Sequence, residues 1–509
     1  MSGPALLMGG RPQARCSCWL AVALVAPALC LAQEPNPGGA RSAAIPGGSG
    51  VPAAELPGAA LPGEPLRSSF LTGITGLAQP PGEYLRYGAA AGLGASDNVN
   101  FSATRPKSQT LAAANLFFDL LRTGSRLTVS ALGNFSDINY LEHAYSNEVL
   151  GRFDGVATAT LWQNHLEWLA REAYGDTQVN ALEAMTPANL ERTNVFSTGP
   201  DLTLTPTLSS YFDLRALYSR SSYQRSPFDA QAETGSAEVG HHFSPVSTIS
   251  LTALVEQLTF DNTMVNRNYQ RREYYGHYSL QGARTAIDLQ AGVTQANDVG
   301  SWRTSPLARL SLSRDVSAYS TVTLGGGREY ADAIGSFTNL TAIGGGSIPI
   351  APVAQTTANA LHTYGSLDWS FHRLRTSVGL SGRWERSTYQ LQPQYNVTRA
   401  DIGLTLDRHL TPALSGNIMA TVSRGEYFNQ GFTDKSGRLG AGLVYRLARW
   451  AVIYGRYDHQ FRRPSGQVAQ GLSFDENRVF IMIGYYPHSP GAESPGRIPG
   501  TGFPTPPGF

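Results

Sequence analysis

The feature that most constrains this chain is an alternation of apolar and polar residues that recurs along most of its 509 residues. In the stretch "RTSVGLSGRWERS" (375–387), Val378, Leu380 and Trp384 share one parity, while charged and small polar residues fill most of the other. Successive side chains of a β-strand point to opposite faces, so this period predicts strands with one apolar and one polar face. The pattern recurs in residues 286–295, 360–371, 398–407 and 438–445.

About 20 such segments follow one another, each about 10 to 15 residues long, which is the length that a tilted strand needs to cross a bilayer. Short turns alternate with longer links, as in barrels whose tight turns lie at one end and whose long loops lie at the other. If both ends of the region lie on one side of a membrane, the strand count is even. Residues 83–486 are therefore predicted to form an all-β fold, a transmembrane antiparallel up-and-down β-barrel of about 20 strands (18–22). The expected short turns are residues 121–125, 162–165, 205–209, 244–247, 282–284, 314–317, 372–373, 408–413 and 446–449.

A soluble β-sandwich or propeller is the alternative, because its strands would also alternate, with the apolar parity turned into a dry core. Three features favour the membrane barrel. The segments exceed the roughly 5 or 6 residues that are usual for soluble strands, aromatic residues cluster near the predicted strand ends as interfacial girdles require, and the turn lengths alternate throughout. A closed barrel also leaves no unpaired backbone edge in lipid.

Residues 1–32 have the order of a secretory signal peptide, in which Arg11 and Arg15 precede an apolar run that ends at Ala32. The run contains Pro27 and is too short for a membrane-spanning helix, which needs about 20 apolar residues. Acylation of Cys30, as in a lipoprotein, is the weaker alternative. All three cysteines lie in this segment, so the mature chain is expected to form no disulfide. Cleavage near Ala32 would direct the barrel to the outer membrane of a Gram-negative bacterium.

Two segments that are rich in Pro, Gly and Ala flank the barrel region. Residues 33–82 are expected to form a periplasmic linker, and residues 487–509 a C-terminal tail, because neither has enough large apolar residues for a core. No later stretch approaches about 18 consecutive apolar residues, so no helix is expected to span a membrane. Insertion would depend on strands alone.

Composition and motifs argue against an enzyme and against nucleic-acid binding. The formal net charge is +1 and no block of Lys or Arg stands out, so the electrostatic footprint of a nucleic-acid site is missing. The chain has no nucleophile-elbow, zinc-protease or phosphate-loop motif, and we assign no catalytic, cofactor-binding or metal-ligating residue. The adjacent His241 and His242 would point to opposite faces of a strand and are not expected to chelate one ion. A surface enzyme built from Ser and His on neighbouring strands stays an alternative without a candidate pair.

A barrel of about 20 strands would enclose a lumen too wide for side chains to fill. The polar parity of the predicted strands supplies both signs of charge, which favours pairs that solvate the wall and tie strands together over a strongly selective ring. The Gly-rich, apolar loop 331–357 would constrict this lumen, cap it for a partner, or remain a surface loop. The candidate lumen-lining residues are Arg375, Arg383, Glu385, Arg399, Asp401, Arg456 and Asp458.

Two short segments carry a resemblance to known proteins. The first predicted strand leads into "DNVN" (97–100), and the last opens with "DENR" (475–478) before "VFIMIGYY". With these segments, and over roughly residues 84–486, the chain resembles the outer-membrane barrels associated with exosortase/PEP-CTERM systems and the wider group of β-barrel porins near exopolysaccharide loci. The resemblance implies a role at the outer membrane in polysaccharide export or surface-protein sorting, and it carries over no catalytic residue.

We therefore expect a non-enzymatic, porin-like outer-membrane barrel that forms or supports a passage for a polar solute or exopolysaccharide. The alternative is a plugged structural barrel that serves as a scaffold or assembly partner at the cell surface. The expected partners are outer-membrane lipid, the barrel assembly machinery, and polysaccharide or components of an export system. The machinery would read a signal near residues 481–486. Neither nucleic acid nor a cofactor is expected.

Overall fold

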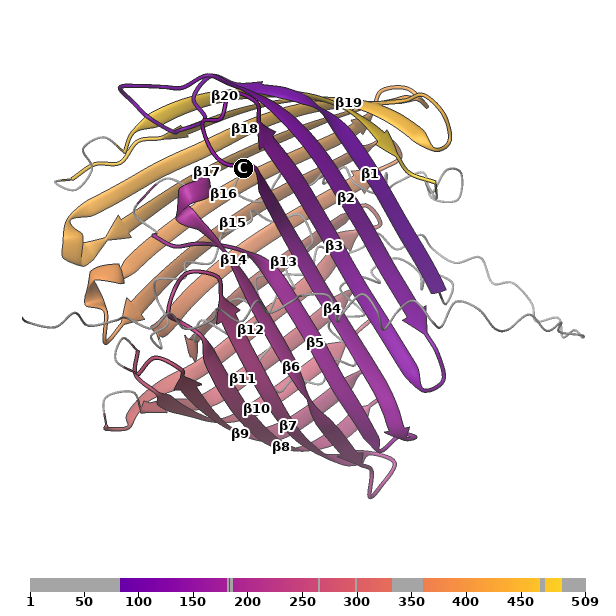
Figure 1. Ribbon diagram of the computed structural model, residues 1–509. Helices are drawn as coiled ribbons and strands as arrows, with labels where there is room; N and C mark the ends of the chain where they lie inside the picture. Colours follow the sequence, from indigo (N-terminus) through magenta and orange to yellow (C-terminus); the bar gives the residue numbers. More distant parts are fainter. Residues whose placement is uncertain are drawn as a thin grey trace, which may run out of the picture. The chain divides into compact units, whose positions relative to one another are not determined.

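Twenty antiparallel strands make up the fold in the computed structural model, and consecutive strands pair throughout (Figure 1). Each strand has 12 to 15 residues. The last strand returns to the first, with Ala89 opposite Tyr485 and Ser96 opposite Arg478, so the sheet closes into a barrel. The predicted all-β, antiparallel up-and-down barrel of about 20 strands is confirmed. The strands are β1 (Glu83–Ser96), β2 (Gln109–Thr123), β3 (Leu127–Tyr140), β4 (Glu148–Trp162), β5 (Leu166–Gln178), β6 (Leu190–Leu204), β7 (Ser210–Tyr223), β8 (Ala230–Ser244), β9 (Ser247–Phe260), β10 (Tyr269–Gln281), β11 (Thr285–Asn297), β12 (Arg303–Ser317), β13 (Ser320–Ala331), β14 (Ala360–Arg373), β15 (Thr376–Tyr389), β16 (Val397–His409), β17 (Leu414–Tyr427), β18 (Phe432–Arg446), β19 (Ala451–Arg462) and β20 (Phe474–Tyr485).

The structure describes part of the chain, and all of that part belongs to one compact unit. Three predicted segments, the signal peptide 1–32, the linker 33–82 and residues 488–509 of the tail, lie outside the described residues, and so does the predicted loop beyond residue 331. The described residues are 83–180, 183, 186–263, 266–297, 300–331, 360–466 and 472–487. Within these ranges, no helix is long and apolar enough to cross a membrane.

The connections differ in length between the two ends of the barrel. At one end, here called the turn end, the strands are joined by two to five residues, and β1 begins and β20 ends there. At the other end, here called the loop end, most connections are longer and include short 3-10 turns. The alternation of short and long connections that the sequence predicts is therefore present.

Two of the short turns lie slightly further along the chain than predicted. Strand β12 continues through residues 314–317, because Asp315 accepts a hydrogen bond from the Thr321 hydroxyl (2.7 Å) across a bulged ladder. Residues 372–373 belong to β14, and the turn falls on Leu374 and Arg375 instead. Leu374 has a φ of 45°, which is rare for leucine, so residue type did not indicate this turn.

Side-chain parity separates the two faces of the wall. In β20, Val479, Ile481 and Ile483 are exposed by 47%, 62% and 62%, whereas Phe480 and Met482 between them are buried. Side chains on the convex outer face of a closed sheet splay apart and those on the concave inner face converge, so the exposed parity points outward. The same rule in β15 places Leu380 and Trp384 outside, and the charged Arg383 and Glu385 inside.

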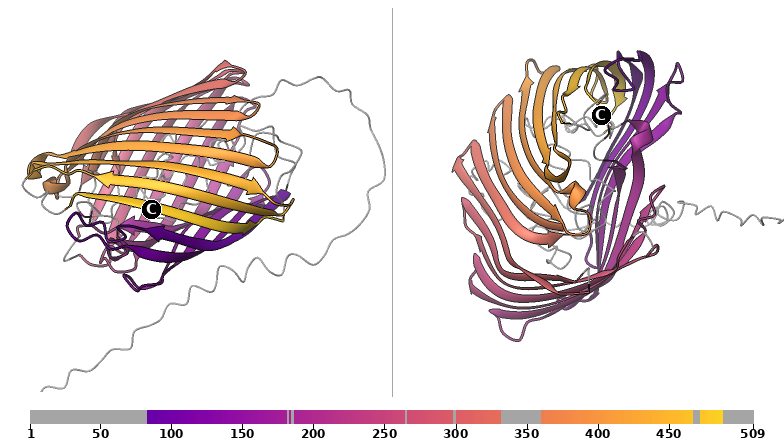
Figure 2. Two further views of the ribbon diagram at one scale, coloured as in Figure 1. Left: turned by 90° about the horizontal axis from the view of Figure 1, so that it is seen from above. Right: turned by 90° about the vertical axis from the view of Figure 1, so that its left-hand side faces the viewer.

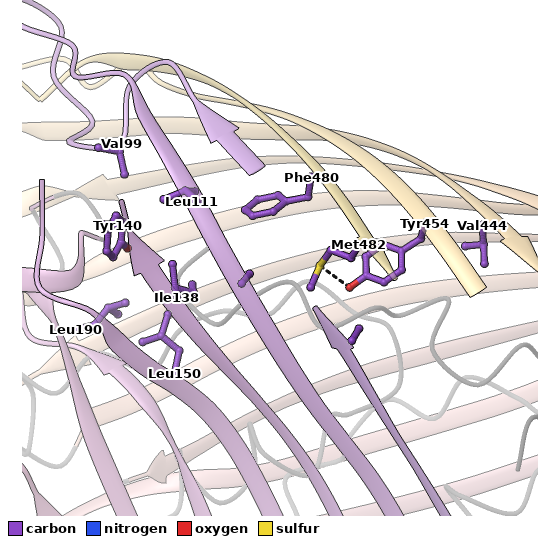
Figure 3. Close-up of a cluster of buried hydrophobic side chains, with 12 residues drawn as sticks. Val99, Leu111, Ile138, Tyr140, Leu150, Leu190, Val444, Tyr454, Phe480 and Met482 are labelled. Atoms are coloured by element: carbon purple, nitrogen blue, oxygen red, sulfur yellow. Dashed lines mark hydrogen bonds between the residues drawn. The ribbon is translucent and has the colours of Figure 1, made fainter. Parts of the chain in front are cut away.

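A closely packed corner lies inside the barrel where β20 meets β1. Every inward position of β1 from residue 88 to residue 94 is Gly or Ala, and the side chains of Phe480, Met482 and Tyr454 lie over this bare surface (Figure 3). A Cβ added to Gly92 would lie 2.1 Å from the Ile481 carbonyl oxygen, so only glycine allows the two backbones to approach this closely. The inner apolar cluster around this corner consists of Ala90, Val99, Leu111, Ala113, Ile138, Tyr140, Leu150, Leu190, Val444, Tyr454, Phe480 and Met482.

Candidate functional site

Paired charges line the inner wall from β4 to β19, with Arg171–Asp154 and Arg215–Asp201 on β4 to β7, and the first of two larger groups lies on β9 to β13. Arg309 on β12 contacts Glu273 on β10 through Nη2 (3.0 Å) and Glu329 on β13 through Nε (2.6 Å). Arg271 continues the series, since its Nη2 lies 3.0 Å from Glu256 Oε2 on β9. These five side chains, here called the buried ladder, are almost fully buried. They come from β9, β10, β12 and β13, and Arg309 also donates a hydrogen bond to Gln290 on β11 (2.9 Å), so the contacts connect five consecutive strands on the inner face.

The second group lies on β14 to β19 and includes most of the predicted lumen residues. Arg383 and Glu385 on β15 form an ion pair (2.8 Å), and so do Arg399 and Asp401 on β16 (2.9 Å). The two pairs meet across the ladder, because Arg383 lies opposite Asp401 and Glu385 lies opposite Arg399. His362 on β14 adds a contact to Glu385 (2.9 Å). The four charged residues therefore alternate in sign in a square, here called the charge square.

The other predicted residues are placed apart from the charge square. Arg456 and Asp458 form an ion pair on β19 (2.7 Å), and Arg438 on β18, which was not among the predicted lumen residues, also contacts Asp458 (2.8 Å). Arg375 lies in the turn between β14 and β15 rather than in a strand, so it is not part of the inner ladder. In the segment "RLGAGLVY" (438–445), Arg438 lies on the polar parity of the alternation. This position could have identified Arg438 as a lumen-lining residue from the sequence.

The segments that carry the family resemblance meet at the loop end of the β1–β20 junction. The carboxylate of Asp97 accepts hydrogen bonds from the Asn477 backbone N–H (2.8 Å) and from its Nδ2 (2.7 Å). Asn98 Nδ2 donates to the Asp475 carbonyl (2.7 Å), and the Ser96 hydroxyl donates to Glu476 (2.5 Å). These contacts join the first strand to the last where the backbone pairing of the two strands ends. We call this set of contacts the clasp.

Loops at the loop end pack onto the inner apolar cluster. Val99, in the loop after β1, belongs to that cluster together with Leu111 and Tyr140, and the Phe101 ring lies 4.7 Å from the Phe474 ring. Tyr145, in the loop after β3, lies edge-on to Tyr140 at 5.4 Å. Near the β1–β20 junction the inner wall therefore combines this apolar cluster, which loops cover at the loop end, with the buried charged residues Glu476 and Arg478 of β20.

The described part of the barrel shows no metal centre. No group of three or more His, Cys, Asp or Glu side chains there is arranged to hold a metal ion. The neighbouring histidines contact different partners, because His241 Nδ1 lies 3.0 Å from the Ser210 hydroxyl and His242 Nδ1 lies 2.8 Å from the Thr248 hydroxyl. The two histidine side chains are therefore not placed to hold one ion together.

The comparisons with known proteins give one family match and several similar folds. The model of the family described as "Putative beta-barrel porin 2" matches residues 353–484, which include strands β14 to β19 and nearly all of β20. No curated protein matches the chain. Together with the closed barrel, the family match defines a porin-like β-barrel of the outer-membrane type.

Three of the similar solved structures are bacterial receptors or transporters. The siderophore receptor PirA from Pseudomonas aeruginosa is 11% identical, with 80% of this chain and 81% of that chain covered and a TM-score of 0.38. A mutant of the ferric enterobactin receptor PfeA from the same organism, in complex with enterobactin, is 9% identical, with 80% and 82% covered and a TM-score of 0.41. The FrpB iron transporter from Neisseria meningitidis, in its apoprotein form, is 6% identical, with 79% and 81% covered and a TM-score of 0.39.

Proposed function

We propose that the chain is a non-enzymatic barrel of the bacterial outer membrane that provides a passage for polar solutes, with exopolysaccharide as the polymer it would serve. The observation that carries this proposal is the charged inner wall, in which ion pairs line strand after strand of a barrel whose outer face is apolar. A polar inner face behind an apolar outer face is typical of barrels that enclose a water-filled channel.

The distribution of charge also supports weak ion selectivity. In the charge square, two arginines face two carboxylates, and Asp458 lies between Arg438 and Arg456. Neither sign dominates these groups, so we expect cations and anions to pass at similar rates. A polar, uncharged polymer would meet hydroxyl, carboxylate and guanidinium groups along the same wall, which supports exopolysaccharide as a substrate class together with the family resemblance.

The test is single-channel recording from residues 33–509 in planar bilayers. We expect discrete conductance steps with weak selectivity. The variant Arg456→Glu should shift the reversal potential towards cation selectivity, because it adds a negative charge next to Asp458. The outward variant Trp384→Phe is the matched control and should leave both conductance and selectivity unchanged. Steps that do not respond to Arg456→Glu would contradict a path along this wall.

A plugged scaffold is the second candidate, and the buried inner residues favour it. Leu111, Ile138 and Glu273 belong to the inner wall, yet they are completely buried, so parts of this wall do not face open solvent. A barrel of this kind would contribute its loop end to surface partners, including components of an export system. Complete absence of conductance from folded, inserted protein would support the scaffold and overturn the passage.

A further inference from the structure

We propose that the outer face of β15 to β18, at the loop end, binds the phosphate-bearing headgroup of an anionic lipid. The inference rests on the membrane location proposed above and adds a ligand class to it. These four strands lie side by side on one face of the barrel (Figure 2). Three cations on that face and the apolar residues beside them form the site.

The three cations point outward near the loop ends of their strands. Arg386, Arg424 and Lys435 are exposed and share the parity of the exposed apolar residues in β15, β17 and β18. Arg424 and Lys435 lie directly opposite each other across β17 and β18. Like charges in this position repel, and an anion that binds both side chains would remove the repulsion.

Few other groups compensate these charges. Glu426 forms an ion pair with Arg424, and its register partner on β16 is the uncharged Thr398. The Arg386 guanidinium lies over the Phe428 ring, 5.5 Å from its centroid, and Thr398 is also its register partner. One carboxylate therefore faces three cations, and the patch keeps an excess of positive charge. Guanidinium and ammonium groups are the usual protein donors to phosphate oxygens.

The apolar side chains beside the cations distinguish a lipid ligand from a free phosphate ion. Trp384, Ile402, Val422 and Leu439 expose 44%, 63%, 57% and 47% of their surface on the same face. Trp384 and Val422 precede Arg386 and Arg424 by two residues, so they are the adjacent outward side chains on the same strands. A phosphate ion would use only the cations, whereas a phospholipid would place its acyl chains on the apolar residues and its phosphate on the cations. The combination favours the lipid.

The experiment measures lipid retention by the folded chain in detergent micelles, using native mass spectrometry. The probes are phosphatidic acid and diacylglycerol with identical acyl chains, and inorganic phosphate as competitor. We expect retention of phosphatidic acid over diacylglycerol. The triple variant Arg386→Gln, Arg424→Gln, Lys435→Gln should raise the phosphatidic acid concentration needed for half-occupancy by about tenfold or more. The matched control is Arg408→Gln, which removes an exposed outward arginine of β16 at the turn end. Arg408 lies opposite Thr376 and Gly416, so no cation opposes it, and the control should retain phosphatidic acid as the unmodified chain does.

Three results would overturn the inference: equal retention of the two lipids, unchanged retention by the triple variant, or displacement of phosphatidic acid by equimolar inorganic phosphate. Heat-modifiable gel mobility shows whether each variant is folded, and a conservative triple change to lysine at both arginines and arginine at Lys435 should restore retention if the first variant misfolds. Flotation with phosphatidylcholine vesicles tests the membrane location separately. A chain that does not float contradicts the proposed function, whereas a chain that floats without preferring phosphatidic acid contradicts only the lipid site.

Discussion

At the scale of single residues, the most consequential group is Arg309. It is the link between Glu273 and Glu329, and all three side chains are almost completely removed from solvent. A buried ion pair has little net advantage over apolar packing, yet removal of one partner leaves the other charge unpaired in a medium of low dielectric constant. The buried ladder therefore makes the barrel sensitive to single changes at this point.

We predict that Arg309→Met lowers the free energy of unfolding by about 3 to 5 kcal/mol, because two buried carboxylates lose their cation. Urea titration of the folded barrel in micelles measures this difference. Arg126→Met, which removes an exposed arginine from the turn between β2 and β3, is the control and should change stability by less than about 0.5 kcal/mol. Equal effects of the two changes would show that the ladder is not buried as described.

Tyr486 gives a second prediction at this scale, because its ring lies next to the inward glycines Gly88 and Gly484 just after β20. Burial raises the pKa of Tyr486 to about 12. A tyrosine whose pKa is raised by folding contributes stability that is present below its ordinary pKa of about 10 and is lost as the pH rises through about 12. The difference in stability between the unmodified chain and Tyr486→Phe should therefore change between pH 10 and pH 12 and stay constant below pH 9. A difference that is independent of pH would contradict the burial of this ring.

At the scale of elements, the junction of β1 and β20 is the point at which the barrel closes. Its register pairs cover Ala89 to Ser96 and leave the first six residues of β1 without partners on β20, whereas β1 pairs with β2 along its whole length. The clasp at one end and the close approach at Gly92 compensate for the shorter ladder. Closure therefore depends on a few specific residues of β1.

We predict that Gly92→Val disrupts this junction, because its side chain would overlap the Ile481 carbonyl oxygen and the Met482 backbone. The expected cost is about 3 kcal/mol or more. Formation of a disulfide between Ala91→Cys and Ile483→Cys, which are register partners, measures closure in a chain of residues 33–509, which otherwise contains no cysteine. Gly235→Val is the control, since an added Cβ there meets no atom within 4 Å. Efficient cross-linking in the Gly92→Val background would contradict the account of closure.

Whether the sequence predicts a contact depends on how far apart the two residues lie along the chain. Arg383 and Glu385, or Arg456 and Asp458, lie two positions apart in one strand, so their period predicts both the face and the pairing. Arg309 meets Glu273 and Glu329 from strands on either side, and no period within one strand contains that information. The contacts of Arg309 depend on the register between neighbouring strands, and the turns set that register. Leu374 shows why turns are hard to place, because it takes a positive φ without a residue type that favours it.

At the scale of the whole molecule, the barrel is a closed wall with two chemically different faces. The outer parity carries large apolar residues on strand after strand, and the inner parity carries the buried ladder, the charge square and the apolar corner. Strands of 12 to 15 residues, tilted by about 40°, rise roughly 30 to 38 Å, which is enough to cross the apolar band of about 25 Å that such barrels present to lipid. The proposed passage and the proposed lipid site are consequences of this one arrangement.

The measurement that tests it most directly is a cysteine scan of residues 377–385 in β15, with the protein inserted in vesicles. Each single cysteine is treated with a water-soluble thiol reagent and, separately, carries a spin label whose contact with lipid is read from relaxation by oxygen. We predict strict alternation: positions 377, 379, 381, 383 and 385 react with the aqueous reagent, and positions 378, 380, 382 and 384 contact lipid. Reaction at every position, or lipid contact at the positions of Arg383 and Glu385, would contradict a barrel that separates lipid outside from a polar wall inside.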